Sequence, residues 1–182
     1  MGKIKQPPPV KLIVSIFTGD ETLLAVARGA LANRFGPMDY QSELLSFYHT
    51  DYYTREFGPG LVRQIVAFTE LIPAERLAEV KRTTNELELS WEVDGKRRVN
   101  LDPGYVSLGK LVLATTKDYS HRIYLGQGIY AEVTLKYEHG HFQPWEWTYP
   151  DYASAQYLAI FGQIRRTYAE QLHGMHAKEE GP

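Results

Sequence analysis

Apolar positions in the first half of the chain switch between strand-like runs and helix-like spacings. Residues 10–17, VKLIVSIF, form a near-continuous apolar run rich in β-branched residues, which predicts a strand. In the following segment apolar residues recur on one helical face, and Thr18 with Glu21 matches a T-x-x-E capping box. Gly36-Pro37 would end this helix. Residues 40–49 and 63–72 are predicted strands.

A second helix is predicted from Pro73, a residue well suited to the first helical position. Apolar spacings of three and four extend it to Trp91, but residues 87–93 also alternate, which leaves a strand as the alternative for the last part. Asp94-Gly95 marks a turn before a short strand at 96–101. The order strand, helix, strand, strand, helix, strand predicts an α+β fold with a ferredoxin-like split βαβ core and a mainly antiparallel sheet.

The second half of the chain is predicted to extend this core by a β-hairpin and a C-terminal helix. Asp102-Pro103-Gly104 would form a turn, and Ser107 would cap a short helix. Two strands follow, joined at residues 126–128, with a further turn at His139-Gly140. We expect one domain, 1–182, comprising an extended lead (1–9), the ferredoxin-like core (10–101), a helix-hairpin extension (102–143) and the C-terminal helix (151–174). The last helix would bury a face formed by Tyr157, Phe161, Ile164, Tyr168 and Leu172.

Composition narrows the classes of protein. The 182 residues include no cysteine, which excludes disulfides and thiolate metal sites and is typical of a reducing cytoplasm. No stretch approaches the ~20 apolar residues of a membrane span, and the first residues, MGKIKQPPP, lack an apolar signal segment. We therefore expect a cytoplasmic protein with no membrane association.

Charge is unevenly distributed. The chain carries −2 overall, but residues 96–122 contain six basic and two acidic side chains, so this window is +4 and the remainder −6. A positive island in an acidic protein favours a small anionic metabolite or nucleotide over general nucleic-acid binding. A solvated face with chance clustering is the alternative.

Residues 104–111, GYVSLGKL, nearly match the phosphate-binding loop G-x-x-x-x-G-K-[ST]. Leu111 stands where a magnesium-binding hydroxyl is needed, and only about 70 residues follow. The stretch is better interpreted as a strand leading into a capped helix, with Leu111 in the core.

The densest group of chemically capable side chains lies between residues 100 and 132. Basic side chains there predict an anion site, with further contacts from a tyrosine and an amide: Lys110, Lys117, Arg122, Tyr105 and Asn100. His121, together with Asp102 or Glu132, could transfer protons. A solvent-facing strand with an Arg–Glu cross-strand pair is an equally open interpretation.

Other candidates are weaker. His49, Asp51 and Glu56 are hard metal ligands without a diagnostic spacing, so no metal site is predicted, and the cofactor is left unassigned. Trp145 and Trp147 are expected to attach the last helix to the sheet.

Several long stretches resemble one prokaryotic family. They are VNLDPGYVSLGKLVLATTKDYSHRIYLGQGIYAEVTL, TDYYTREFGPGLVRQIVAF, TTNELE and WTYPDY, and the resemblance that extends through them covers nearly the whole chain. The chain is similar through them to the family catalogued as domain of unknown function 4416. The resemblance implies a stand-alone cytosolic protein of about this length, without an assigned activity, cofactor or catalytic residue. Some members of the family carry a GTP-binding label.

Two functions follow from these observations. The first is a protein that binds a small anionic, phosphate- or nucleotide-like ligand; whether it is also an enzyme is left open. The alternative is a non-catalytic interaction or regulatory module whose tyrosine-rich surface, with 13 tyrosines in the chain, self-associates as a homo-oligomer or binds a protein partner.

Overall fold

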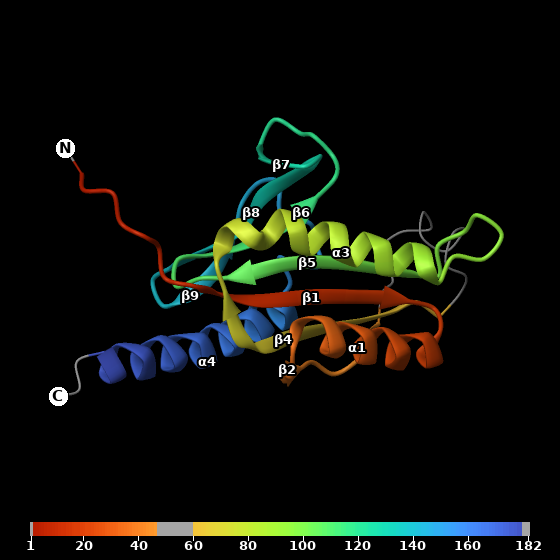
Figure 1. Ribbon diagram of the computed structural model, residues 1–182, viewed down its shortest axis with the longest axis horizontal. Coiled ribbons are helices and arrows are strands. Elements are labelled where there is room, and N and C mark those ends of the chain that lie inside the picture. Colours follow the sequence, from red (N-terminus) through yellow and green to blue (C-terminus); the bar gives the residue numbers. More distant parts are fainter. Residues whose placement is uncertain (1, 47–59, 180–182) are drawn as a thin grey trace.

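Strand β1 (Val10–Thr18) lies at the centre of the sheet, and all nine of its residues are buried. The structure is a computed structural model that describes residues 2–46 and 60–179 (Figure 1). β1 pairs antiparallel with β4 (Val62–Ile72) on one side and β5 (Val99–Val106) on the other. Because helices cover both faces of β1, its sequence is a near-continuous apolar run and does not alternate between apolar and polar residues.

Nine strands form a single sheet within the described part of the chain, and every pairing between them is antiparallel. The order along the sheet is β2-β4-β1-β5-β6-β8-β7, with β3 beside β4 and β9 beside β8. The remaining strands are β2 (Met38–Gln41), β3 (Leu45–Ser46), β6 (Lys110–Thr115), β7 (Arg122–Gly126), β8 (Ile129–Glu138) and β9 (His141–Pro144).

Helices cover the sheet on both faces. α1 (Glu21–Phe35) and α3 (Leu77–Ser90) pack on one face through a core that includes Leu12, Val14 and Ile16 of β1. α4 (Ala155–Glu179) packs on the opposite face, against Ile13, Ile65 and Ala67. Figure 1 shows α1 and α3 on the near side of β1 and β5, and α4 beneath β9 and β4.

The α+β class, the antiparallel sheet, the hairpin and the C-terminal helix are confirmed. The order β2-β4-β1-β5, with α1 and α3 on one face, is compatible with the predicted ferredoxin-like arrangement. Both strands of the 122–138 hairpin and the turn at His139-Gly140 lie where the pattern placed them. The predicted 40–49 strand corresponds to the shorter strands β2 and β3, and residues 47–49 lie outside the described part.

Three helix boundaries differ from expectation. Asp20 caps α1, because its carboxylate accepts a 3.0 Å hydrogen bond from the Leu23 N–H, whereas Thr18 ends β1 and donates to the Arg98 carbonyl. α3 follows a short 3-10 turn (Ala74–Arg76) and continues to Ser90, so the strand alternative for its end is wrong. α4 buries its predicted face but continues past Gly174 to Glu179, since a glycine on an exposed helix surface lowers helix stability without ending the helix.

The helix predicted from Ser107 is wrong. β5 continues through Asp102-Pro103-Gly104 to Val106, a tight turn follows, and β6 begins at Lys110. Leu111 and Val112 are both buried but belong to different core clusters on opposite faces, a pattern that fits a strand covered on both sides. Leu111 is buried as predicted.

Position 104 requires glycine because β5 and β6 pack closely there, and not because the chain turns. A Cβ atom at this position would stand 2.3 Å from the Val112 carbonyl oxygen and 2.7 Å from a Leu113 methyl group. β5 and β6 therefore approach each other at Gly104 in a way that only glycine permits.

Candidate functional site

A pocket of about 680 Å³ opens where β5 and β6 separate. The two strands pair only from Gly104 to Val106 and from Leu111 to Leu113, next to their connecting turn. Beyond this point α3 forms one wall, the end of β6 with β7 and β8 forms the other, and Arg63 with residues 149–152 lies across the base. The divergence of two central strands thus creates an opening in the sheet that is lined by polar groups.

Nine charged side chains line this pocket, and most of them are paired. The cationic ones are Arg63, Lys81, Arg97, Lys117 and Arg122, and the acidic ones are Glu88, Asp102, Glu132 and Asp151. Four of the five cations lie within 4 Å of one of these carboxylates. Lys117 has no ion pair within the described residues, so the described lining has a net charge of +1.

Lys81 and Asp102 connect α3 to β5 beside the pocket. The buried Lys81 ammonium donates to the Leu101 carbonyl at 2.9 Å and to Asp102 Oδ1 at 3.2 Å, while Asn100 Nδ2 donates to Asp102 Oδ2 at 2.6 Å. Burial by itself would raise the pKa of Asp102, but the Lys81 and Arg63 charges and these hydrogen bonds lower it below its ordinary value. Asp102 is therefore a carboxylate at neutral pH.

Glu88 lies about two helical turns beyond Lys81 and is also buried. Its Oε1 accepts a 2.6 Å hydrogen bond from the Leu101 N–H, and its Oε2 is 3.6 Å from Arg97 Nη1. Burial raises the pKa of Glu88 above its ordinary value, although Lys81 and the hydrogen bond from Leu101 oppose the rise. Two acids on adjoining walls therefore have pKa values shifted in opposite directions.

At the base of the pocket, Arg63 is enclosed by aromatic rings. Its guanidinium carbon lies 5.4 Å from the centre of the Phe17 ring, 5.7 Å from that of Tyr152 and 5.9 Å from that of Tyr157, and it forms an ion pair with Asp151. Burial raises the pKa of the Tyr152 phenol well above its ordinary value, so this hydroxyl stays protonated. Arg63 and Asp151 therefore form a buried ion pair at the base of the pocket.

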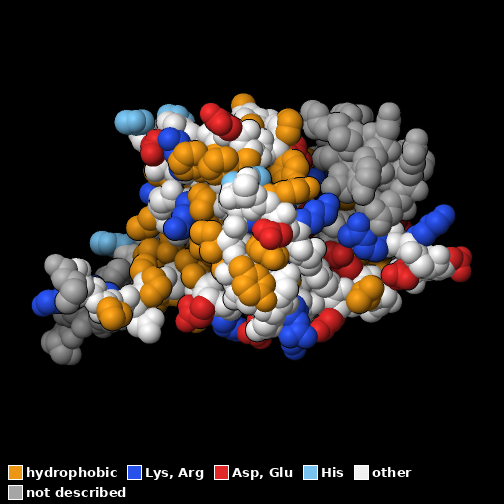
Figure 2. Space-filling view, turned by 90° about the horizontal axis from the view of Figure 1, so that it is seen from above, with side chains coloured by type: hydrophobic (Ala, Val, Ile, Leu, Met, Phe, Trp, Pro, Cys, Tyr) orange, Lys and Arg blue, Asp and Glu red, His pale blue; other side chains and the backbone are white. Residues whose placement is uncertain are grey.

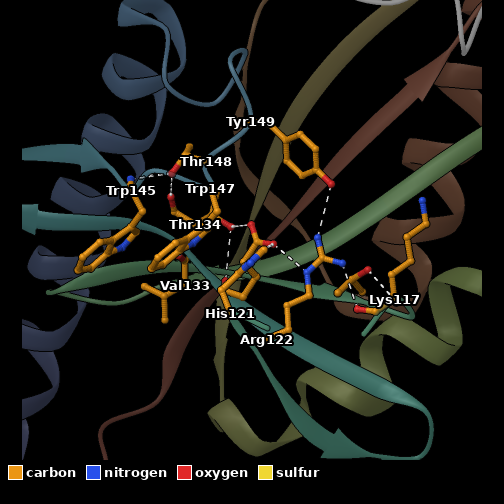
Figure 3. A network of polar contacts seen from close by, with 11 residues as sticks. Lys117, His121, Arg122, Val133, Thr134, Trp145, Trp147, Thr148 and Tyr149 are labelled. Atoms are coloured by element: carbon orange, nitrogen blue, oxygen red, sulfur yellow. Dashed lines mark hydrogen bonds and ion pairs between the residues drawn. The ribbon is translucent and has the colours of Figure 1, made fainter. Parts of the chain in front are cut away.

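Glu132 is the centre of a second polar network, drawn in Figure 3. Arg122 Nε donates to Glu132 Oε2 at 2.8 Å, and His121 Nε2 lies 3.0 Å from the same oxygen. Arg122 also donates to the Lys117 carbonyl at 3.0 Å and stacks on Tyr119, with 4.3 Å from its guanidinium carbon to the ring centre. Arg122 therefore holds the loop that carries Lys117 at the pocket.

A row of stacked rings continues from this network. His121 stacks on Trp147 at 5.2 Å between ring centres, and Trp147 stacks on Trp145 at 5.1 Å (Figure 3). The Trp147 indole N–H donates to the Val133 carbonyl at 3.0 Å, and the Thr148 hydroxyl donates to the Thr134 carbonyl at 2.6 Å. The tryptophans thus attach the connector after β9 to β8, whereas an attachment of the last helix had been expected.

The structure brings together five of the eight predicted site residues. Lining the pocket are Asn100, Asp102, Lys117, Arg122 and Glu132. His121 contacts Glu132 from outside the group that lines the pocket. Tyr105 lies among core residues, and Lys110 stands at the opposite end of β6 from Lys117, about 20 Å away by strand length. The glycine-and-lysine stretch at 104–111 thus forms a hairpin turn away from the pocket, and no helix follows it.

Sequence reasoning did not assign five charged residues of the pocket to a site: Arg63, Lys81, Glu88, Arg97 and Asp151. Lys81 and Glu88 were detectable in principle, because they are seven residues apart and share the helical face of Leu77 and Thr84. Arg63 and Asp151 contact each other although they are 88 positions apart in the sequence, and no local sequence signal indicates such a contact.

His49, Asp51 and Glu56, considered above as metal ligands without a predicted site, lie outside the described residues. Within residues 2–46 and 60–179, no group of three or more His, Asp or Glu side chains is arranged to hold a metal ion. None of the helices in this part of the chain is long and apolar enough to cross a membrane.

Fold and site together define an α+β protein with one antiparallel sheet and a polar pocket between two of its central strands. The model of the family described as Domain of unknown function (DUF4416) matches residues 8–168, and the chain belongs to this family. No curated protein and no solved structure matches the chain.

Proposed function

We propose that this protein binds a small anionic ligand in the pocket between β5 and β6. The observation that carries the proposal is the charge of the lining: four carboxylates accompany five cations, and Lys117 has no acidic partner among the described residues. Lys117 is exposed at the edge of the pocket, where its ammonium attracts an anion that enters the concave site.

Pocket size and hydrogen-bonding groups support the same class of ligand. A volume of about 680 Å³ lies within the usual range for metabolite sites. Thr115 and Thr116 precede Lys117, and Asn85 and Asn100 lie on the facing wall. Hydroxyl and amide groups around a lysine suit a phosphate or carboxylate attached to a polar body, such as a nucleotide or a sugar phosphate.

Any proton transfer at this site would depend on the carboxylates that line the pocket and on the neighbouring His121. Asp102 is ionised and oriented by Lys81, so it can accept a proton, but its lowered pKa makes it a weaker base than Glu88, whose pKa burial raises. Glu132 faces the pocket, and His121 would act through it as a positioning residue. We keep His121 with Asp102 or Glu132 as the acid–base hypothesis, in a protein that we place in the cytoplasm because it lacks cysteine.

Thermal unfolding with a panel of ligands tests the proposal. The panel contains inorganic phosphate, nucleoside mono- and triphosphates, sugar phosphates and sugar acids. A ligand present at about 100 times its dissociation constant should stabilise the protein by about 2.7 kcal/mol. Lys117→Gln should weaken the binding of that ligand by about tenfold or more, which corresponds to the loss of one charged hydrogen bond.

Lys110→Gln is the matched control, because Lys110 flanks the same strand at the end remote from the pocket. Its affinity for the ligand should equal that of the wild type. The proposal fails if no member of the panel stabilises the protein, or if the two lysine variants bind equally well.

The alternative function, a module that self-associates or binds a protein partner, draws support from a different part of the molecule. Three consecutive residues of β7, Ile123, Tyr124 and Leu125, are exposed at the end of the sheet. Both functions would be ruled out if no ligand of the panel stabilises the protein and the protein also remains a monomer throughout a dilution series.

A further inference from the structure

The net charge of the described pocket lining lies on one of its walls. Lys117, which follows β6, has no ion pair within residues 2–46 and 60–179, and Figure 3 shows its side chain pointing away from the Arg122–Glu132 pair. Ion pairs neutralise the other lining charges: Lys81–Asp102 and Arg97–Glu88 on the wall of α3 and β5, Arg63–Asp151 at the base, and Arg122–Glu132 on the wall of β6 to β8. An anionic group is therefore attracted to the β6 wall, whereas the facing wall suits an uncharged part of the same ligand.

The strand register sets these two walls opposite each other. Extending the β5–β6 register beyond its last pair would place Asp102 opposite Thr115 and Asn100 opposite Lys117. The strands separate instead, and all four of these residues line the opening. A ligand that spans the opening therefore contacts an acid and an amide on one side, and a hydroxyl and an ammonium on the other.

α3 supplies hydrogen bonds to β5 where β6 no longer pairs with it. The Leu101 N–H donates to Glu88 Oε1 at 2.6 Å, and the Leu101 carbonyl accepts from the Lys81 ammonium at 2.9 Å. Both main-chain groups of Leu101 are thus engaged, and so are the two charged side chains of α3. The groups that this wall presents to a ligand are the side chains of Asp102, Asn100 and Asn85.

Asp102 and Asn85 have unused hydrogen-bonding capacity. The Asp102 side chain is 40 % exposed, and each carboxylate oxygen accepts one hydrogen bond, from Lys81 or Asn100, although such an oxygen has two lone pairs. The Asn85 amide lines the pocket and forms no hydrogen bond within the described residues. Hydroxyl groups match this pair, because a hydroxyl can donate to the carboxylate and also accept from the amide.

We propose that the pocket binds a polyhydroxylated compound with one anionic group, the chemistry shared by sugar monophosphates and sugar acids. The anionic group lies at Lys117, and hydroxyl groups lie at Asp102 and Asn85. A triphosphate fits less well, because its additional negative charges would approach Glu132 and Asp102. On the face shown in Figure 2, Lys and Arg side chains are interspersed with Asp and Glu side chains, so this face offers no continuous positive surface to a longer polyanion. The inference rests on the proposed function and narrows it.

Isothermal titration calorimetry of the wild type tests the class of ligand. The probes are pentose and hexose monophosphates, the corresponding sugar acids, the parent sugars, inorganic phosphate, AMP and ATP. At least one sugar monophosphate or sugar acid should bind about tenfold or more tightly than its parent sugar, inorganic phosphate and ATP. The comparison of the monophosphates with the acids identifies which anionic group the pocket takes.

Asn85→Ala tests the hydroxyl contact, and alanine preserves the helical preference of α3. This variant should bind the sugar ligand about three- to tenfold more weakly, as expected for the loss of one uncharged hydrogen bond, and should bind inorganic phosphate like the wild type. A deoxy analogue that lacks the hydroxyl at Asn85 should bind the variant and the wild type equally. Glu86→Gln, on the exposed side of α3, is the control and should bind every probe like the wild type. Melting temperatures show that each variant is folded.

The outcomes separate this inference from the proposed function. If ATP or inorganic phosphate binds as tightly as the best sugar ligand and Lys117→Gln weakens that binding, the anion pocket stands and the polyhydroxylated ligand is excluded. A folded Asn85→Ala variant with wild-type affinity for every sugar ligand and its deoxy analogues also contradicts the inference. If none of the probes binds the wild type, both proposals fail.

Discussion

The Lys81 ammonium on α3 lies 3.2 Å from Asp102 Oδ1 on β5, at the point where β5 leaves β6 and the pocket begins. The same ammonium donates to the Leu101 carbonyl, so one buried cation joins helix and strand through both a side chain and the main chain. The pair holds one wall of the pocket in place and keeps Asp102 ionised.

Asp102 should stabilise the protein in a pH-dependent way. Burial by itself would raise its pKa, but Lys81 and Arg63 lower it in the folded state. Its ionised form therefore contributes stability above the unfolded-state pKa of about 3.9, and this contribution is lost as the pH falls through the lower folded-state pKa. We expect Asp102→Asn to reduce the free energy of unfolding at pH 7, and the reduction to shrink below about pH 4. Urea unfolding of both proteins between pH 3 and 7 measures it; a reduction that grows in acid would contradict it.

Glu88 should show the opposite dependence. Burial raises its pKa in the folded state, so its contribution is complete below the unfolded-state pKa of about 4.3 and is lost as the pH rises through the folded-state pKa. Glu88→Gln retains an oxygen for the Leu101 N–H without the charge. We expect this variant to gain stability relative to the wild type as the pH rises from about 4 to neutrality. Glu86→Gln, on the exposed side of α3, is the control and should show no such trend.

Lys11 is fully buried and joins three elements to β1. Its ammonium donates to Asp39 of β2 at 2.6 Å, to the Phe68 carbonyl at 2.9 Å and to Gln171 of α4 at 2.9 Å. Lys11→Met leaves these acceptors without a donor and should reduce the free energy of unfolding by about 3 kcal/mol. Lys11→Met with Asp39→Asn should recover part of the loss. Chemical denaturation measures both, and a double variant no more stable than the single one would show that the ion pair is not the cause.

Two glycines of the same hairpin should respond differently to alanine. A Cβ at Gly104 would meet the Val112 carbonyl oxygen at 2.3 Å, whereas a Cβ at Gly109 has no atom within 4 Å. Gly104→Ala should reduce the free energy of unfolding by about 1–3 kcal/mol, because β5 and β6 must move apart. Gly109→Ala should change it by less than about 0.5 kcal/mol. Equal effects in urea unfolding would mean that close approach of the strands is not what requires Gly104.

Local sequence pattern was sufficient to predict elements that are buried either along their whole length, as a central strand is, or on one face, as a surface helix is. The run at 10–17 predicted β1, and the spacing of Tyr157, Phe161, Ile164 and Tyr168 predicted the buried face of α4. Positive-φ positions at Asp94, Gln127 and His139 coincide with turns that residue type predicted. In each case the signal lies within a few residues of the element it specifies.

The segment from Asp102 to Thr115 shows where local pattern is insufficient. Asp-Pro-Gly is a common turn sequence, and Leu108, Leu111, Val112 and Thr115 fit a helical face. The surrounding sheet overrides both preferences: β1 pairs with β5 through Pro103 and Gly104, and Leu111 and Val112 find apolar partners on opposite faces. A short apolar run is compatible with either element until its neighbours are known.

The sequence by itself determined the α+β class, most of the strands and helices, the positive window at 96–122 and five residues of the pocket, because these depend on composition and on periodicity along the chain. Only the tertiary structure decided that β5 and β6 diverge, that Arg63, Lys81, Glu88 and Asp151 converge there, and that Lys110 lies away from the pocket. The physical reason is that a pocket is formed where strands fail to pair. That failure depends on packing between residues as far apart as Arg63 and Asp151, which no local pattern encodes.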